Sequence, residues 1–111
     1  MSTGALTADR RSRPGRRALV ATDLRTLRGP VTGVVDLPHR LVWAPSPAGR
    51  FDLDDPYDRK RMYEIVLREA IQSGELRTWL NGGLLADLWP ELYLPRGVRQ
   101  AWEAVHPGLA A

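Results

Sequence analysis

The sequence predicts a small α+β domain, in which an N-terminal β-hairpin packs on a cluster of about four helices. Residues 31–53 are rich in Val, Trp and Phe and are broken by Pro and Gly, which is typical of short strands. Apolar residues at helical spacing follow, from Tyr63 to Ile71. The chain has 111 residues, 43% hydrophobic and 26% charged, which suits one ordinary globular domain.

Residues 1–17 form an arginine-rich leader that we expect to be disordered. The leader is poor in apolar residues, so ordering it would cost more conformational entropy than burial could recover. We therefore place the single small α+β domain at 18–111. Its first segment, "ALVATDLRTLRGP" (18–30), is either a short helix capped at Thr22 or a strand, and Gly29-Pro30 ends it.

The hairpin is predicted within residues 31–53. Its strands are 41–43 and 51–53, because these flank "APSPAGR", a connection of hairpin length. A single hairpin is marginally stable alone, so it must lie on an apolar surface.

A long helix that begins after Asp55 provides this surface. Asp55 is the expected N-cap, Pro56 the first helical residue and Asp58 an acidic residue of the first turn. Gly74 is expected to end the helix. The apolar residues at helical spacing are Tyr63, Val66, Leu67, Ala70 and Ile71.

Shorter helices should share a core with the long one, since helices under about 12 residues are marginal alone. We expect one at 75–80 and one at 83–89, with Asn81 as the cap of the second and Pro90 closing it. The last helix takes Pro95 as its first helical residue, and its apolar face consists of Val98, Ala101, Trp102 and Val105.

The chain has no cysteine, which excludes disulfides, thiol nucleophiles and cysteine-bound metals and favours a reducing compartment. The apolar run "ALVA" at 18–21 is far shorter than a signal-peptide core or a membrane span of about 20 residues. We therefore expect a cytoplasmic protein with no membrane partner.

The net charge of +3 is concentrated at the N-terminus. Residues 1–30 hold seven arginines against Asp9 and Asp23, a balance of +5, whereas residues 31–111 hold nine basic and eleven acidic residues, a balance of −2. The body of the chain is therefore not a basic nucleic-acid-binding domain.

No catalytic, cofactor-binding or metal-binding signature is recognisable. Four aspartates in "DLDDPYD" (52–58) could hold a hard cation in a metal-dependent hydrolase, but a proline and a helix start favour helix capping. His39 and His106 are 67 positions apart and give no metal-ligand spacing, although His39 could act as a base to one of the aspartates. We predict that the protein is not an enzyme and needs no cofactor.

The segment "RTWLNGGLLADLWPELYLP" (77–95) and the last helix contain more large apolar side chains than one hairpin and one long helix can readily cover. Trp and Tyr are enriched at the centres of protein interfaces. We therefore predict a non-catalytic protein-binding surface, for another protein or a second copy, formed by Trp79, Leu88, Trp89, Tyr93 and Trp102.

The alternative function is a DNA-binding transcriptional regulator. Five arginines within "RRSRPGRR" could contact phosphates, and three polar residues of the last helix could share a face. The residues of this alternative are Arg10, Arg11, Arg13, Arg16, Arg17, Arg96, Arg99 and Gln100.

Two stretches, "DLDDPYDRKRMYEIVLREA" (52–70) and "LLADLWPELYLPRGVRQAW" (84–102), resemble a set of small conserved proteins of high-GC bacteria. Members of this set are encoded near nucleotidyltransferase-like toxins. The resemblance implies an antitoxin-like or regulatory role with a toxin-like enzyme as partner. Its motifs are structural, so no functional residue is carried over from it, and it does not extend to the arginine leader.

Overall fold

The structure is a computed structural model that describes residues 18–42 and 49–110. In chain order its elements are η1 (Leu24–Thr26), β1 (Val34–Asp36), α2 (His39–Val42), β2 (Arg50–Asp52), α3 (Pro56–Glu69), α4 (Ser73–Trp79), α5 (Gly82–Leu88), η2 (Trp89–Glu91), α6 (Arg96–Val105) and η3 (Pro107–Ala110). A two-stranded antiparallel sheet and a set of helices confirm the predicted α+β class. The predicted leader, 1–17, lies outside the described residues.

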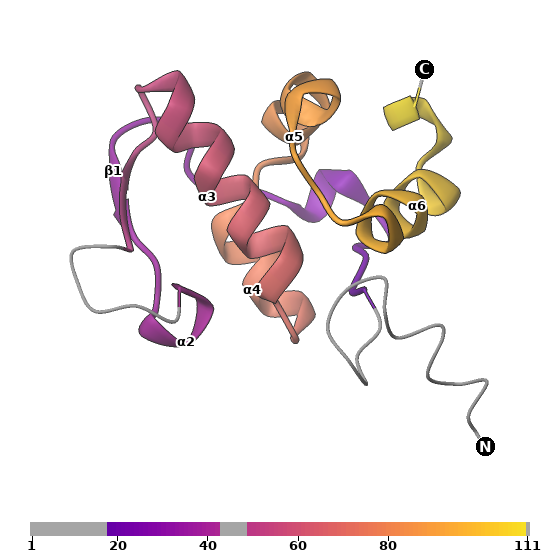
Figure 1. Cartoon of the computed structure of the whole chain (residues 1–111), viewed down its shortest axis with the longest axis horizontal. Coiled ribbons are helices and arrows are strands. Elements are labelled where there is room, and N and C mark those ends of the chain that lie inside the picture. The colour runs from indigo at the N-terminus through magenta and orange to yellow at the C-terminus, as the bar shows by residue number, and fades with distance from the viewer. Residues whose placement is uncertain (1–17, 43–48, 111) are drawn as a thin grey trace.

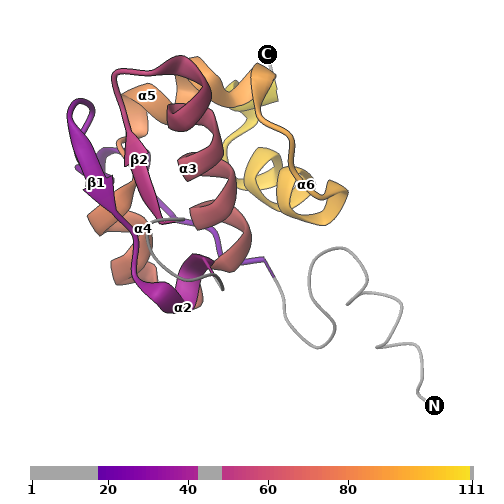
Figure 2. The ribbon, with the colours of Figure 1, turned by 60° about the vertical axis from the view of Figure 1, so that its left-hand side comes forward.

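Helix α3 lies between the hairpin and α6 in both views of the chain (Figure 1, Figure 2). It packs against β2, α2 and α4. The first described residues run beside α6 (Figure 1), where a 2.6 Å hydrogen bond joins ring nitrogen Nε2 of His106 to the carbonyl oxygen of Ala21. The two ends of the described chain are therefore tied to each other.

Strands β1 and β2 pair with Val34 opposite Asp52, Val35 opposite Phe51 and Asp36 opposite Arg50. The side chains of Val35 and Phe51 are buried, while their neighbours along each strand are exposed. This alternation is the expected one for a hairpin with one face on a core. The second predicted strand, 51–53, is thus found one residue earlier in the chain.

The predicted first strand at 41–43 is wrong. Leu41 and Val42 belong to helix α2, and Trp43 lies outside the described residues. Proline is favoured at the start of a helix because its φ is already helical, and the carbonyl of Pro38 accepts a 2.9 Å hydrogen bond from the Leu41 N–H. The strand that pairs with β2 lies before this proline.

Helix α3 begins as predicted. Asp55 is its N-cap and accepts a 2.9 Å hydrogen bond from the Asp58 N–H, and Pro56 is the first helical residue. The helix ends at Glu69, earlier than the predicted stop at Gly74. The reason is the capping box of α4, in which the side chain of Glu75 accepts hydrogen bonds from two backbone N–H groups at 71–72.

The remaining helices are short, as predicted. Asn81 caps α5 by accepting a 3.0 Å hydrogen bond from the Leu84 N–H. The chain continues from α5 into η2, so Pro90 lies inside a helical turn and does not close α5. Pro95 is the N-cap of α6 and not its first helical residue. At the N-terminus, η1 is a 3₁₀ turn capped by Asp23, where a cap at Thr22 or a strand was expected.

One core collects side chains from every part of the described chain. The largest fully buried side chains are Trp89, Trp102, Tyr63, Leu41, Leu53, Met62, Leu67, Leu76, Leu80, Leu85, Val66 and Val98. The rings of Trp89 and Trp102 lie 6.2 Å apart at 44°, which is a tilted aromatic pair. The two indoles therefore hold η2 on α6.

Candidate functional site

The five residues predicted to form a protein-binding surface do not form one exposed patch. Trp102 and Trp89 are 0% and 1% exposed, and Leu88 is 8% exposed, so all three belong to the core. This corrects their assignment to an exposed surface. Trp79 is half-buried against the core, and Tyr93 is 85% exposed.

Polar partners from α6 explain how Trp89 is covered. Its indole N–H donates a 2.8 Å hydrogen bond to the carboxylate of Glu103. The guanidinium of Arg99 lies over the same ring, 5.0 Å from its centroid. These partners come from ten and fourteen positions further along the chain, which an apolar count over a short segment does not register.

Tyr93 is held outward by the backbone. Its N–H donates a 2.7 Å hydrogen bond to Oε2 of Glu64, a residue of α3. The two flanking leucines, Leu92 and Leu94, are buried or half-buried. The main chain is therefore fixed on α3 while the phenol ring faces solvent.

A second exposed tyrosine lies on the same side of α3. Tyr57 is 64% exposed, and the guanidinium of Arg61 lies 5.8 Å from its ring centroid. Tyr57, Arg61 and Glu64 follow the helical spacing i, i+4, i+7 and so share one face of the helix.

An ion pair of 3.2 Å between Lys60 and Glu91 joins the same face to η2. We call this patch the tyrosine face, and it consists of Tyr57, Lys60, Arg61, Glu64, Glu91 and Tyr93. The predicted binding surface contains Tyr93 but not Tyr57. The i, i+4, i+7 spacing of a tyrosine with charged residues is the signal that would have found it.

The residues of the DNA-binding alternative are also divided by the structure. The five arginines of the leader lie outside the described residues. Arg96 and Gln100 are exposed on α6. Arg99 is turned inward, where it donates hydrogen bonds to the carbonyls of Leu92 and Trp89. The predicted face of three polar residues therefore keeps only two.

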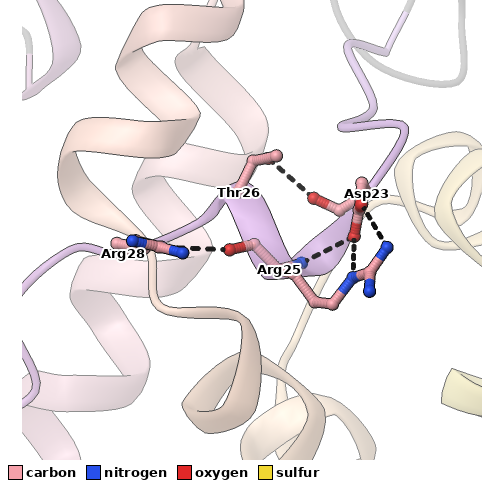
Figure 3. Close-up of polar contacts among 4 residues, drawn as sticks. All are labelled: Asp23, Arg25, Thr26 and Arg28. Atoms are coloured by element: carbon pink, nitrogen blue, oxygen red, sulfur yellow. Dashed lines mark hydrogen bonds and ion pairs between the residues drawn. The ribbon is translucent and has the colours of Figure 1, made fainter.

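The arginines next to the leader in the described chain are engaged locally (Figure 3). Arg25 donates two hydrogen bonds, of 3.1 and 3.0 Å, to the carboxylate of Asp23. This hydrogen bonding lowers the pKa of Asp23 and raises that of Arg25. Arg28 donates a 3.5 Å hydrogen bond to the carbonyl of Arg25. A phosphate would have to displace Asp23 to gain both N–H groups of Arg25.

Three of the four aspartates of 52–58 accept hydrogen bonds from backbone N–H groups. Asp58 accepts a 3.0 Å hydrogen bond from the Asp52 N–H, Asp52 accepts one of 2.9 Å from the Asp54 N–H, and Asp55 caps α3. In the part of the chain that the structure describes, no group of three or more His, Cys, Asp or Glu side chains is placed to hold a metal ion.

The two histidines lie in different parts of the fold. His39 is exposed at the start of α2. His106 follows α6, where its ring lies 5.9 Å from the ring of Trp102 and hydrogen-bonds the backbone of Ala21. His106 thus has a structural role at the junction of the two chain ends.

No helix among 18–42 and 49–110 is both long and apolar enough to cross a membrane. No family model, curated protein or solved structure matches this chain.

Proposed function

We propose that this protein is a non-catalytic protein-binding module that contacts its partner through the tyrosine face. The observation that supports the proposal is the exposure of Tyr93 (85%) and Tyr57 (64%) on a surface whose backbone and charges are held in place. Tyrosine provides a large rigid contact area with few rotatable bonds, and tyrosine and arginine are enriched among the residues that dominate interface energetics.

The charges of the face indicate the chemistry of the partner. Lys60 and Glu91 neutralise each other, and Glu64 accepts the Tyr93 N–H. Arg61 lies over the Tyr57 ring, and its side chain is exposed. The complementary surface would therefore be an apolar groove for two phenol rings, with a carboxylate beside it for Arg61.

Copurification from the native host tests the proposal. The wild-type chain should retain a stoichiometric partner protein, and the double variant Tyr57→Ala, Tyr93→Ala should lose it. Ile71→Ala is the matched control, since Ile71 is an exposed apolar residue (48%) outside the tyrosine face. The proposal would be contradicted if the double variant retained the partner to the same extent as the control. It would also be contradicted if the wild-type chain copurified with no other protein.

An antitoxin-like or regulatory role, with a toxin-like enzyme as partner, is a finer proposal that rests on the resemblance of 52–102 alone. The neighbouring reading frames test it, because an adjacent toxin-like gene would supply the expected partner and its absence would remove the support. A cytoplasmic location is a separate proposal, because a chain without cysteine suits a reducing compartment.

DNA binding is the second candidate function, and it is supported by the exposure of Arg96 and Gln100 on α6. If α6 reads a groove, retention on DNA should survive deletion of 1–17 and weaken in Arg96→Ala with Gln100→Ala. If deletion of the leader abolishes all retention, α6 has no part in it.

A further inference from the structure

The two outer edges of the hairpin differ. Two backbone hydrogen bonds flank the paired strands: the Leu37 N–H donates to the Gly49 carbonyl at 2.9 Å, and the Leu53 N–H donates to the Gly33 carbonyl at 2.8 Å. Because hydrogen-bonded and non-hydrogen-bonded pairs alternate in an antiparallel sheet, residues 33, 35 and 37 face β2. The backbone N–H and C=O groups of Val34 and Asp36 therefore point away from β2.

The outer edge of β2 is partly closed by the chain itself. The N–H of Asp52, which points away from β1, donates a 3.0 Å hydrogen bond to the carboxylate of Asp58. Among 18–42 and 49–110, the outward N–H and C=O groups of Val34 and Asp36 have no such partner. Strand β1 lies at the margin of the molecule in both views (Figure 1, Figure 2).

The side chains of β1 do not block this edge. Proteins commonly protect an edge strand with charged side chains, lysine above all, or with proline. Here Val34 is 61% exposed, and the one charged residue of the strand, Asp36, is neutralised by a 3.1 Å ion pair with Arg50. Such an edge is suited to pairing with another strand.

We propose that β1 pairs antiparallel with β1 of a second copy of this chain, which joins the two hairpins into a four-stranded sheet. The pattern is self-complementary: if Val35 lies opposite its own copy on the two-fold axis, Val34 faces Asp36 of the other copy in both directions. Each of these two pairs exchanges two backbone hydrogen bonds, so all four outward groups of each strand are satisfied.

Side-chain chemistry favours a second copy in this register. No like charges are directly opposite, because each Asp36 lies between Arg50 of its own chain and Val34 of the other. Each exposed Val34 side chain then lies between Asp52 of its own chain and Asp36 of the other copy. A folded unit of fewer than 100 residues also buries a modest share of its surface, so association adds stability that the monomer lacks.

Sedimentation of the full chain tests the proposal. The wild type should be a dimer, and Asp36→Pro should be a monomer with an unchanged far-ultraviolet circular dichroism spectrum. Proline removes only an N–H that points away from β2, and proline is tolerated at a strand edge for this reason. Asp36→Ala is the matched control, since it loses the same exposed ion pair but keeps the N–H, and it should remain a dimer.

A second pair of variants tests the register and keeps the proposal falsifiable if Asp36→Pro does not fold. Val34→Asp places like charges opposite each other and should raise the dimer dissociation constant about tenfold, whereas Val34→Lys faces Asp36 of the other copy and should not. Equal effects of the two variants would overturn the register.

A wild type that stays monomeric up to about 1 mM would overturn the dimer. A monomer that binds another protein and loses it in Asp36→Pro would assign the edge to a strand of that partner, which also overturns self-pairing. The dimer does not depend on the tyrosine face, so Tyr57→Ala with Tyr93→Ala should leave it intact, and the two proposals can fail separately.

Discussion

The hydroxyl oxygen of Tyr63 accepts a 2.8 Å hydrogen bond from the backbone N–H of Asn81. This contact joins the middle of α3 to the start of α5, eighteen positions away in the chain. Asn81 in turn caps α5 through its side chain. Because Tyr63 is fully buried, the same ring contributes to the core and fixes where the next helix begins.

Replacement of Tyr63 by Phe should lower the free energy of unfolding by about 1–3 kcal/mol. The ring would still fill the core, but the part-buried N–H of Asn81 would lose its acceptor. Urea unfolding of both proteins measures the difference. Tyr57→Phe is the control, since Tyr57 is 64% exposed and its hydroxyl is therefore open to water; equal losses in the two variants would contradict this role.

The same residue predicts how stability depends on alkaline pH. Burial raises the pKa of the Tyr63 phenol above its usual 10.0, and the hydrogen bond from Asn81 offsets this only in part. The folded state therefore keeps this proton more firmly than the unfolded state. Its contribution is complete below about pH 10 and is lost as the pH rises toward the higher folded-state pKa.

Unfolding free energies measured between about pH 9 and about pH 11 should thus decline more steeply for the wild type than for Tyr63→Phe. The difference between the two slopes isolates Tyr63 from the other groups that titrate in this range. Parallel slopes would mean that Tyr63 does not titrate differently in the folded and unfolded states.

Two adjacent glycines at the start of α5 should respond in opposite ways to alanine. A Cβ on Gly82 would overlap the backbone carbonyl of Leu24, so Gly82→Ala must push η1 away from α5. A Cβ on Gly83 would meet only the Asn81 side chain, at 3.5 Å. We expect Gly82→Ala to lose roughly 1–3 kcal/mol by overpacking and Gly83→Ala to gain up to about 1 kcal/mol.

Thermal unfolding of the two glycine variants and the wild type gives these signs directly. If Gly82→Ala is as stable as Gly83→Ala, the close approach of η1 to α5 does not exist in solution.

The elements that the sequence predicts correctly are those whose signals are local. The N-cap of α3 at Asp55 and that of α5 at Asn81 were correctly predicted, because a capping side chain and the N–H it satisfies are three residues apart. The end of α3 was misplaced at Gly74, since the capping box of α4 competes for the same residues. Where two local signals overlap, periodicity alone does not decide between them.

Which large apolar side chains stay exposed could not be predicted in the same way, because burial is decided by partners far along the chain. The apolar composition predicts Trp89 and Trp102 as surplus residues, yet in the structure each covers the other, and Glu103 accepts the hydrogen bond of the Trp89 N–H. The strand at 41–43 failed for a related reason. Residues 34–36 pair with β2 across a long connection, and a short apolar run does not show which segment will pair.

Helix capping by the aspartates predicts a graded effect of alanine substitution. Asp55→Ala should lower the free energy of unfolding by about 0.5–2 kcal/mol, since it removes the N-cap of α3. Asp54→Ala is the control and should stay within about 0.5 kcal/mol of the wild type, because its exposed carboxylate caps nothing among the described residues.

The capping role of these aspartates also predicts that titration of the wild type with calcium or magnesium gives no heat of binding in a calorimeter. A heat that Asp54→Asn with Asp58→Asn abolishes would restore the metal site.

Arg99 distinguishes a structural arginine from a DNA-reading one on the same helix. Its guanidinium donates to the carbonyls of Leu92 and Trp89 and lies over the Trp89 ring, so it holds η2 against α6. Arg99→Ala should lower the free energy of unfolding by about 1.5–3 kcal/mol, the range for hydrogen bonds to charged groups. Arg96 is exposed, and Arg96→Ala should change the free energy of unfolding by less than about 0.5 kcal/mol.

Near-ultraviolet circular dichroism and urea unfolding of the two variants provide the measurement, because the first reports the packing of the aromatic rings, Trp89 among them, and the second reports the stability. In a protein that uses both arginines to bind DNA, Arg99→Ala and Arg96→Ala would weaken DNA retention alike and leave stability unchanged. Since the positive charge removed is the same, a loss of stability confined to Arg99→Ala can arise only from the inward contacts of that side chain.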